Sequence, residues 1–140
     1  LLFGKSNEEF LKQLPLKVNN LGPIFGEQNI AKVYAASDVF VLPSLEDNLP
    51  NTIMESLACE TPVVAFDTGG IPEMIEHQKN GYLSEYKSVD DLLNGLIYVL
   101  TTDLLEETKR FNSSFLQKNV AQKYFEVYKS SKQEAGSGSE

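Results

Sequence analysis

The amino-acid sequence predicts an α/β domain built on a Rossmann-like, doubly wound parallel sheet. Two apolar runs, at residues 39–42 and 63–66, show no polar alternation, which is typical of strands covered on both faces. Between them lies a helix start, with Pro50 at the first helical position and one apolar stripe after it. Strand, helix and strand in this order form a βαβ unit with a right-handed crossover, so the two strands are expected to be parallel.

Four elements are predicted before this unit, and each ends at a proline, a glycine or a polar turn. They are a strand that ends in a glycine turn at residues 1–4, a helix that begins near residue 6 and ends at Pro15, a weaker strand at 17–21, and a helix from about 27 to 36.

The elements predicted after the βαβ unit are mainly helical. They are a turn in which Gly69 and Gly70 supply positive φ angles, a short helix at 71–75, a brief strand at 82–83, a helix opened by Ser88, and helices at 104–111 and 117–132. Ser88 and Asp91 have the spacing of a capping box. We therefore assign residues 1–132 to one incomplete domain and residues 133–140 to a flexible tail or linker.

Composition limits the possible partners. The net charge of −8 argues against nucleic acid or anionic lipid as a partner of this chain. No apolar run approaches the roughly 20 residues that a membrane-spanning helix needs. The single cysteine fits a reducing compartment, so a cytoplasmic location is expected.

The predicted ligand site lies between the first strand of the unit and its helix, because open α/β sheets bind ligands at the carboxyl ends of their strands. The backbone N–H groups of Asn51, Thr52 and Ile53 lie in the first helical turn, where they lack intrahelical partners and favour phosphate. Glu55 follows one turn later and leans back toward the loop that carries Asp47. Two carboxylates accept hydrogen bonds from adjacent hydroxyl groups, so the ligand is expected to be a nucleotide sugar.

The stretch PSLEDNLPNTIMESLACETPVVAFDTGGIPEMI, residues 43–75, resembles the donor-binding signature of retaining glycosyltransferases of the group 1 type. These enzymes have the GT-B architecture of two Rossmann-like domains, and this chain resembles the C-terminal one from about residue 1 to 128. The family has two acidic residues with seven residues between them, as Asp47 and Glu55 have here. The first acid is usually Glu in the family, and Glu46 stands beside Asp47, so either of these two can contact the sugar.

The resemblance implies a role for each site residue. Glu55 is expected to bind the ribose diol and Asp47 the transferred sugar, and these two are the catalytic candidates. The other donor-binding candidates are Asn48, Leu49, Asn51, Thr52, Pro23 and Ile24, the last two through main-chain contacts to the nucleobase. No cofactor and no metal are expected, and the single histidine, His77, stands apart from any ligand cluster.

The predicted function is donor binding in a retaining hexosyltransferase that moves a sugar from a nucleoside-diphosphate sugar to a glycan or lipid-linked acceptor, as in polysaccharide biosynthesis. The partner is an N-terminal domain of the same enzyme, through which the protein can also associate with a membrane surface, and the chain alone is expected to be inactive. The alternatives are a nucleotide-sugar epimerase or phosphorylase of the same architecture, or a non-catalytic fragment that associates with itself.

The resemblance also implies a gap in the sheet. Doubly wound sheets have the strand order 3-2-1-4-5-6, and residues 1–4 most resemble the second strand of the family's domain. Without the first strand, the second and fourth strands would flank a vacant slot with unpaired edges. We expect the chain to rearrange, to exchange a strand with a second copy, or to receive a strand from elsewhere.

Overall fold

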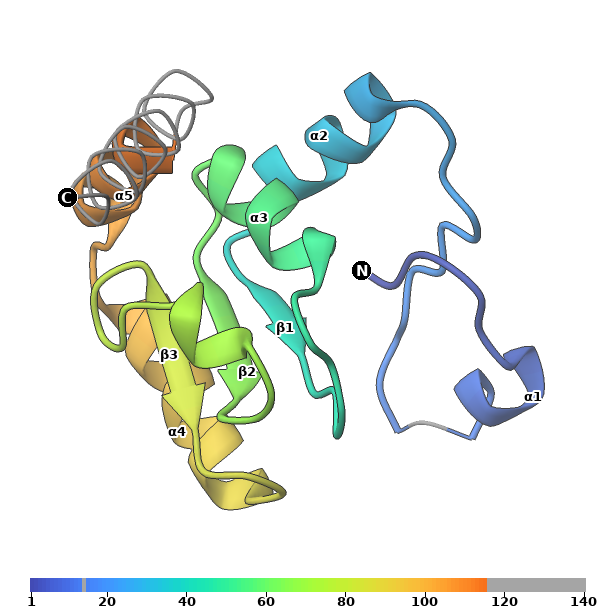
Figure 1. The fold of residues 1–140 in the computed structure, drawn as a ribbon. Coiled ribbons are helices and arrows are strands. Elements are labelled where there is room, and N and C mark those ends of the chain that lie inside the picture. Colours follow the sequence, from blue (N-terminus) through green and yellow to red (C-terminus); the bar gives the residue numbers. More distant parts are fainter. Residues whose placement is uncertain (14, 116–140) are drawn as a thin grey trace, which may run out of the picture.

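The structure is a computed structural model that describes residues 1–13 and 15–115. Three strands, β1 (Phe40–Leu42), β2 (Val63–Phe66) and β3 (Gly81–Ser84), form a parallel sheet in the order β1-β2-β3 (Figure 1). In the register, Phe40 lies opposite Val63, which in turn lies opposite Gly81. The predicted α/β class with a parallel sheet is thus confirmed.

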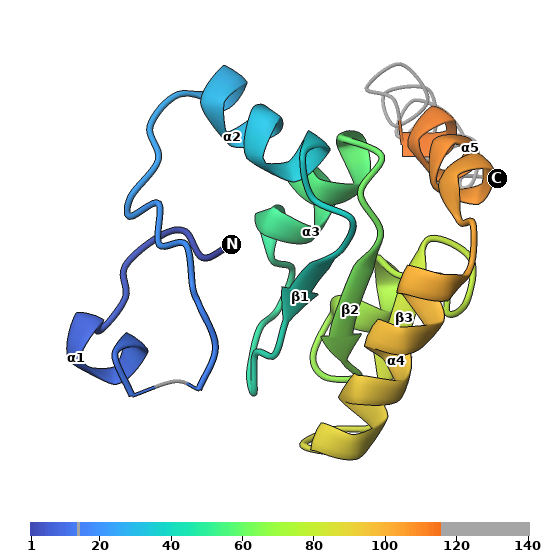
Figure 2. The same ribbon diagram turned by 180° about the vertical axis from the view of Figure 1, so that it is seen from behind.

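Helices cover both faces of this sheet (Figure 2). Their bounds are α1 Glu8–Leu11, α2 Glu27–Ala35, α3 Asn51–Ala58, the 3-10 helix η1 Ile71–Glu73, α4 Val89–Thr101 and α5 Leu105–Phe115. Helix α3 connects β1 to β2 and contacts α2 on one side and α5 on another, whereas α4 packs on β2 and β3. None of the helices in the described residues is both long and apolar enough to span a membrane.

The core has two parts because β2 is buried on both faces. On one face Val63 joins a buried cluster that includes Ile53 and Leu57 of α3. On the other face Val64 packs with Val99 of α4 in a second buried cluster. Helices α3 and α4 therefore cover opposite faces of the sheet, as the continuous apolar run of β2 predicts.

The start of α4 shows the predicted N-cap but only one of the two bonds of a capping box, because the Ser88 N–H donates to the Glu85 carbonyl instead of to Asp91. Ser88 is the N-cap, and its hydroxyl oxygen accepts a hydrogen bond from the Asp91 N–H at 3.2 Å. The Asp91 carboxylate in turn accepts hydrogen bonds from the Glu85 N–H at 2.7 Å and from the Tyr82 hydroxyl at 3.1 Å. These bonds join the end of β3 to the first turn of α4.

The two strands predicted near the N-terminus are reduced to one parallel bridge between Leu2 and Asn20. The Leu2 N–H donates to the Asn19 carbonyl at 2.9 Å, and the Leu21 N–H donates to the Leu2 carbonyl at 2.8 Å. Within the described residues β1 is consequently an edge strand, and Val41 is 36% exposed. The predicted helix at 117–132 and the domain boundary at residue 132 lie outside the described residues.

Candidate functional site

The loops that follow β1 and β2 meet at the carboxyl edge of the sheet. The Gly70 N–H, after β2, donates to the carbonyl of Asp47 at 3.4 Å. A Cβ atom on Gly69 would overlap the Asp47 carbonyl oxygen, and one on Gly70 would overlap that of Asn48. The backbone of the Asp47 loop is therefore held against a turn that admits only glycine.

The two glycines have different reasons for their identity. Gly69 has a φ of +55°, which fits the prediction of a positive φ. Gly70 has a φ of −91°, a value that any residue adopts, so the prediction was wrong for this position. At Gly70 the constraint is the close approach of the Asn48 backbone rather than the backbone conformation.

Helix α3 begins one residue later than predicted. Pro50 is its N-cap rather than its first helical residue, and its carbonyl accepts a hydrogen bond from the Ile53 N–H at 3.0 Å. The prediction of a free amide at Ile53 was therefore wrong, because the first turn tightens to a three-residue bond. The amides of Asn51 and Thr52 remain as the donors at this end of the helix.

Glu55 is held by a side chain of the neighbouring helix. Its Oε2 atom accepts a hydrogen bond from the hydroxyl of Tyr34, in α2, at 3.3 Å. Tyr34 is 1% exposed, and its ring makes edge-to-face contacts with Phe3 and Phe40, with centroids 5.5 Å and 5.3 Å away. Glu55 itself is exposed. The buried Tyr34 therefore orients its carboxylate, while the carboxylate stays accessible to solvent and to a ligand.

Burial and the negative charge of Glu55 both act on the groups beneath it. Burial, followed by the Glu55 carboxylate, raises the pKa of the Tyr34 hydroxyl well above its ordinary range. The same two causes, in the same order, raise the pKa of the Cys59 thiol. Tyr34 therefore remains a protonated hydrogen-bond donor at neutral pH, and Cys59 remains a thiol rather than a reactive thiolate.

The other predicted site residues lie along the same edge or before α2. Asn48, Leu49 and Asn51 are exposed, and Thr52 and Asp47 are half-buried. Glu46 is exposed, so the structure leaves both Glu46 and Asp47 accessible from the loop. Pro23 and Ile24 lie in the segment that leads from the Leu2–Asn20 bridge into α2.

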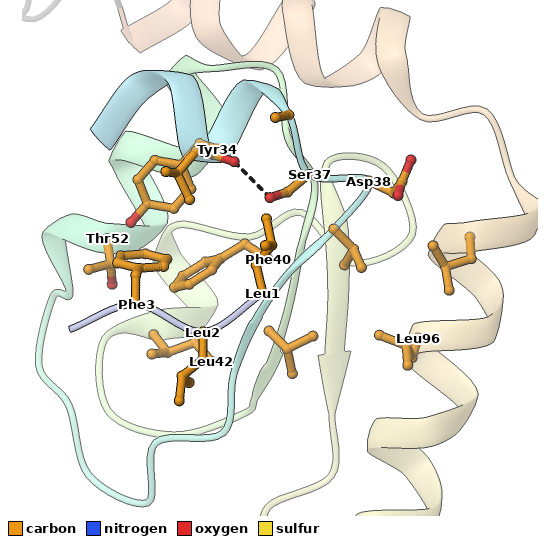
Figure 3. A pocket seen from close by; sticks show the side chains of 15 residues that line it. Leu1, Leu2, Phe3, Tyr34, Ser37, Asp38, Phe40, Leu42, Thr52 and Leu96 are labelled. Carbon is orange, nitrogen blue, oxygen red and sulfur yellow. Dashed lines mark hydrogen bonds between the residues drawn. The ribbon is translucent and has the colours of Figure 1, made fainter. Parts of the chain in front are cut away.

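Tyr34 was not predicted as a site residue, because its position on α2 equally fits the apolar face of a helix. The available signal was its hydroxyl group, since a buried tyrosine usually finds a polar partner. A cavity lies between residues 1–3 and β1, where the sequence predicts a vacant slot in the sheet. It has a volume of about 740 Å³, and Thr52 is the only predicted site residue that lines it (Figure 3).

Comparison with known proteins places these features in a family context. An uncharacterized glycosyltransferase of Methanocaldococcus jannaschii is 31% identical over 119 residues, which are 81% of this chain and 30% of that protein. The N-acetyl-alpha-D-glucosaminyl L-malate synthase of Bacillus anthracis is 32% identical over 79 residues, which are 56% of this chain and 21% of that protein. The chain thus spans less than a third of the length of these relatives.

Solved structures show the same fold. Anabaena Alr3699/HepE in complex with UDP and glucose matches with a TM-score of 0.58 and 22% identity, over 89% of this chain and 40% of that one. The same protein in complex with UDP-glucose matches with a TM-score of 0.57. The profile of the family described as "Glycosyl transferases group 1" matches residues 1–102. The chain therefore belongs to the group 1 glycosyl transferases.

Proposed function

We propose that this chain is the donor-binding domain of a retaining glycosyltransferase of the GT-B architecture. The intact enzyme moves a sugar from a nucleoside-diphosphate sugar to a glycan or lipid-linked acceptor. The observation that carries the proposal is the Tyr34–Glu55 hydrogen bond, which holds an exposed carboxylate one turn inside a helix that starts at the carboxyl edge of a parallel sheet.

Glu55 is assigned to the ribose diol. A carboxylate has two acceptor oxygens, and a diol supplies two donors, so one side chain matches both hydroxyl groups. Tyr34 occupies Oε2 with a single hydrogen bond and leaves further acceptor capacity on both oxygens. Because Tyr34 is fixed by two aromatic neighbours, the carboxylate is preorganised before the nucleotide arrives.

The start of α3 is assigned to the diphosphate. Its free amides at Asn51 and Thr52 and its helix dipole favour an anion. Their interaction with the diphosphate strengthens as the leaving group gains negative charge. The dipole contributes only about 0.3–1 kcal/mol at an exposed site. This contribution is small against the chain's net charge of −8, so the chain alone binds nucleotide weakly, and basic side chains outside these 140 residues supply the rest.

The loop after β1 is assigned to the transferred sugar, through Asp47 or its neighbour Glu46. The contacts of Gly69 and Gly70 hold the loop backbone, so the carboxylates project from a fixed position. Asn48 and Leu49 extend the same edge. The main chain at Pro23 and Ile24 is assigned to the nucleobase.

Several features of the function belong to the intact protein. The acceptor site and part of the donor cleft lie in the N-terminal domain, and this chain alone transfers nothing. We propose a reaction without a catalytic metal or a cofactor, and a cytoplasmic protein that contacts the membrane through its N-terminal domain. Known relatives support the transferase assignment: one that is 31% identical over 77 residues is a UDP-Gal:alpha-D-GlcNAc-diphosphoundecaprenol alpha-1,3-galactosyltransferase of Escherichia coli.

The test is a calorimetric titration of UDP, GDP and ADP into the chain and into the full-length protein. One nucleotide is expected to bind saturably, and Glu55→Ala is expected to weaken it by about 10- to 100-fold, the value of one or two hydrogen bonds to a charged group. Glu27→Ala removes another exposed carboxylate, from α2, and is expected to leave the affinity unchanged.

Two results would contradict the proposal. The first is no saturable binding of any of the three nucleotides, even to the full-length protein. The second concerns stereochemistry, because a retaining enzyme forms a product with the anomeric configuration of the donor, which NMR of the product reveals. Inversion at the anomeric carbon would remove the retaining assignment while leaving the donor-binding assignment in place.

A further inference from the structure

The outer edge of β3 is closed by side chains rather than by another strand. Within the described residues β3 pairs only with β2, so it ends the sheet on the side opposite β1 (Figure 1). The Asp67 N–H, just after β2, donates to the Ser84 carbonyl at 2.8 Å, so Ser84 faces β2. Because backbone groups alternate in direction along a strand, those of Leu83 and Glu85 point away from the sheet. Free groups on such an edge pair readily with another strand.

Two titratable side chains meet these two outward amides. The Leu83 N–H donates a hydrogen bond to Nδ1 of His77 at 3.1 Å. The Glu85 N–H donates to the carboxylate of Asp91 at 2.7 Å. The edge is therefore capped from two sides, by the turn that precedes β3 and by the first turn of α4.

The turn that carries His77 is fixed by further contacts. The Gln78 N–H donates to the Gly81 carbonyl at 2.7 Å, and the Gln78 carbonyl accepts a hydrogen bond from the Tyr98 hydroxyl at 3.1 Å. The His77 ring lies against the ring of Tyr82, with centroids 4.4 Å apart. The imidazole is thus held at the edge by β3 and, through its turn, by α4.

The hydrogen bond from Leu83 selects one protonation state of the imidazole. A neutral imidazole has one N–H donor and one acceptor nitrogen, whereas an imidazolium has two donors and no acceptor. Because Nδ1 of His77 accepts this bond, the proton of the neutral ring lies on Nε2. Histidine changes charge between about pH 5 and pH 8, so the cap at Leu83 is lost within this range as the pH falls.

The charged groups around the imidazole come from its own turn and from α4. Glu76 and Lys79 of the turn are exposed and pair with each other at 3.1 Å. The Asp91 carboxylate attracts a protonated His77, and this carboxylate also accepts the hydroxyl of Tyr82, in β3. Asp91 therefore favours the protonated ring, whereas the bond to the strand edge requires the neutral one.

The cap at Glu85 responds to a different range of pH. The hydrogen bond from the Glu85 N–H is the largest cause that lowers the pKa of the Asp91 carboxyl. Asp91 consequently stays ionised throughout the range in which a histidine titrates. One amide of the edge can therefore be released while its neighbour on the same edge stays bonded.

We propose that His77 is a pH-sensitive cap of the sheet edge: the neutral imidazole closes the edge at Leu83, and protonation opens it there while Glu85 stays capped. The proposal does not depend on the donor-binding assignment, because none of these residues belongs to the candidate site.

The test is amide hydrogen exchange of the chain, followed by NMR between about pH 8 and pH 5. The protection factor of Leu83, which corrects for the intrinsic pH dependence of exchange, is expected to fall by at least about 10-fold as the pH falls. Ser84, which faces β2, is the internal reference and is expected to keep its protection. A Leu83 protection factor that does not change with pH would overturn the proposal.

Two variants separate the hydrogen bond from the ring contact with Tyr82. His77→Phe keeps a ring but has no acceptor, and His77→Asn offers an amide oxygen that accepts at any pH. We expect Leu83 to be unprotected at every pH in the phenylalanine variant and protected at every pH in the asparagine variant. A phenylalanine variant that protects Leu83 as well as the unaltered chain does would show that the imidazole is not the cap.

The tautomer of the ring gives a readout that is independent of exchange. His77 is the single histidine of the chain, so the imidazole ¹⁵N signals belong to it alone. At about pH 8 these signals are expected to show a protonated Nε2 and an unprotonated Nδ1. The opposite tautomer would leave no acceptor for the Leu83 N–H and would overturn the proposal.

Discussion

The hydroxyl of Tyr34 donates a hydrogen bond to Oε2 of Glu55 at 3.3 Å, and this bond joins α2 to α3 at the candidate donor site. If the bond orients the carboxylate for a ribose, Tyr34→Phe weakens nucleotide binding by about 2- to 10-fold, the value of one hydrogen bond. Because Glu55 is assigned to both ribose hydroxyls, the preference for UDP over 2′-deoxy-UDP is expected to shrink in the variant. Calorimetric titration of both nucleotides checks this.

A second tyrosine supplies the control for that experiment. Tyr86 is 43% exposed and contacts Phe66 through its ring, away from α2 and α3. Tyr86→Phe is expected to leave both affinities unchanged. A Tyr34→Phe variant that binds both nucleotides as tightly as the unaltered protein, while Glu55→Ala loses binding, would show that Glu55 acts without Tyr34.

Tyr34 also predicts how stability depends on alkaline pH. Its folded pKa lies above the ordinary value of 10.0, because burial and then the Glu55 charge disfavour the phenolate. The protonated phenol is therefore favoured by folding, so this contribution to stability is complete below pH 10 and is lost as the pH rises toward the folded pKa. We therefore measure the free energy of unfolding in urea between neutral pH and pH 11. Above pH 10 this free energy is expected to fall less in Tyr34→Phe than in the unaltered chain.

Asp91 predicts the opposite dependence at acid pH. The hydrogen bond from the Glu85 N–H lowers the pKa of this carboxyl, and that from the Tyr82 hydroxyl lowers it further. Its contribution is therefore present above the ordinary pKa of 3.8 and is lost as the pH falls through the lowered value. Asp91→Asn is expected to melt below the unaltered chain at pH 7, and this difference is expected to narrow near pH 2. A difference that stays constant with pH would contradict the assignment.

Gly70 predicts a large effect from a single methyl group. Alanine at Gly70 overlaps the Asn48 carbonyl although its φ of −91° is ordinary, so the loop must move. We expect a loss of about 1–3 kcal/mol in the free energy of unfolding, together with weaker nucleotide binding. Gly4→Ala is the matched control, since Gly4 has a φ of +93° but no atom within 4 Å of the added methyl. It is expected to destabilise the chain without changing nucleotide affinity.

The proposal of a metal-independent reaction is tested on the full-length protein. Sugar transfer and nucleotide affinity are expected to be unchanged after treatment with EDTA, because positive groups at the diphosphate come from the helix start and from basic side chains. Nucleotide affinity that falls with EDTA and returns with Mg²⁺ would replace this part of the proposal with a metal-bridged diphosphate.

The central βαβ unit was predictable from local sequence because its pattern and its packing agree. The apolar run of β2 is buried on both faces. Outside this unit, the N-cap of α4 was also predictable, because Ser88 accepts the Asp91 N–H as its spacing indicates. The N-terminal strands were predicted less well. A strand is stable only when its edges are paired, and the described residues pair Leu2 on one side alone.

The candidate site was predictable in its location but not in its contacts. The carboxyl edge of the sheet follows from strand order, and Glu55 from helix spacing. The Tyr34–Glu55 bond depends on how α2 lies against α3, which no local pattern specifies. The Gly70 constraint likewise arises between two loops that are far apart in the sequence.

The ring of Tyr34 packs against Phe40 of β1, and its hydroxyl bonds to Glu55. A substitution that repacks this ring therefore shifts the carboxylate assigned to the ribose without touching the ligand. Nucleotide affinity would then depend on the apolar packing between α2 and β1 as well as on the residues that contact the donor.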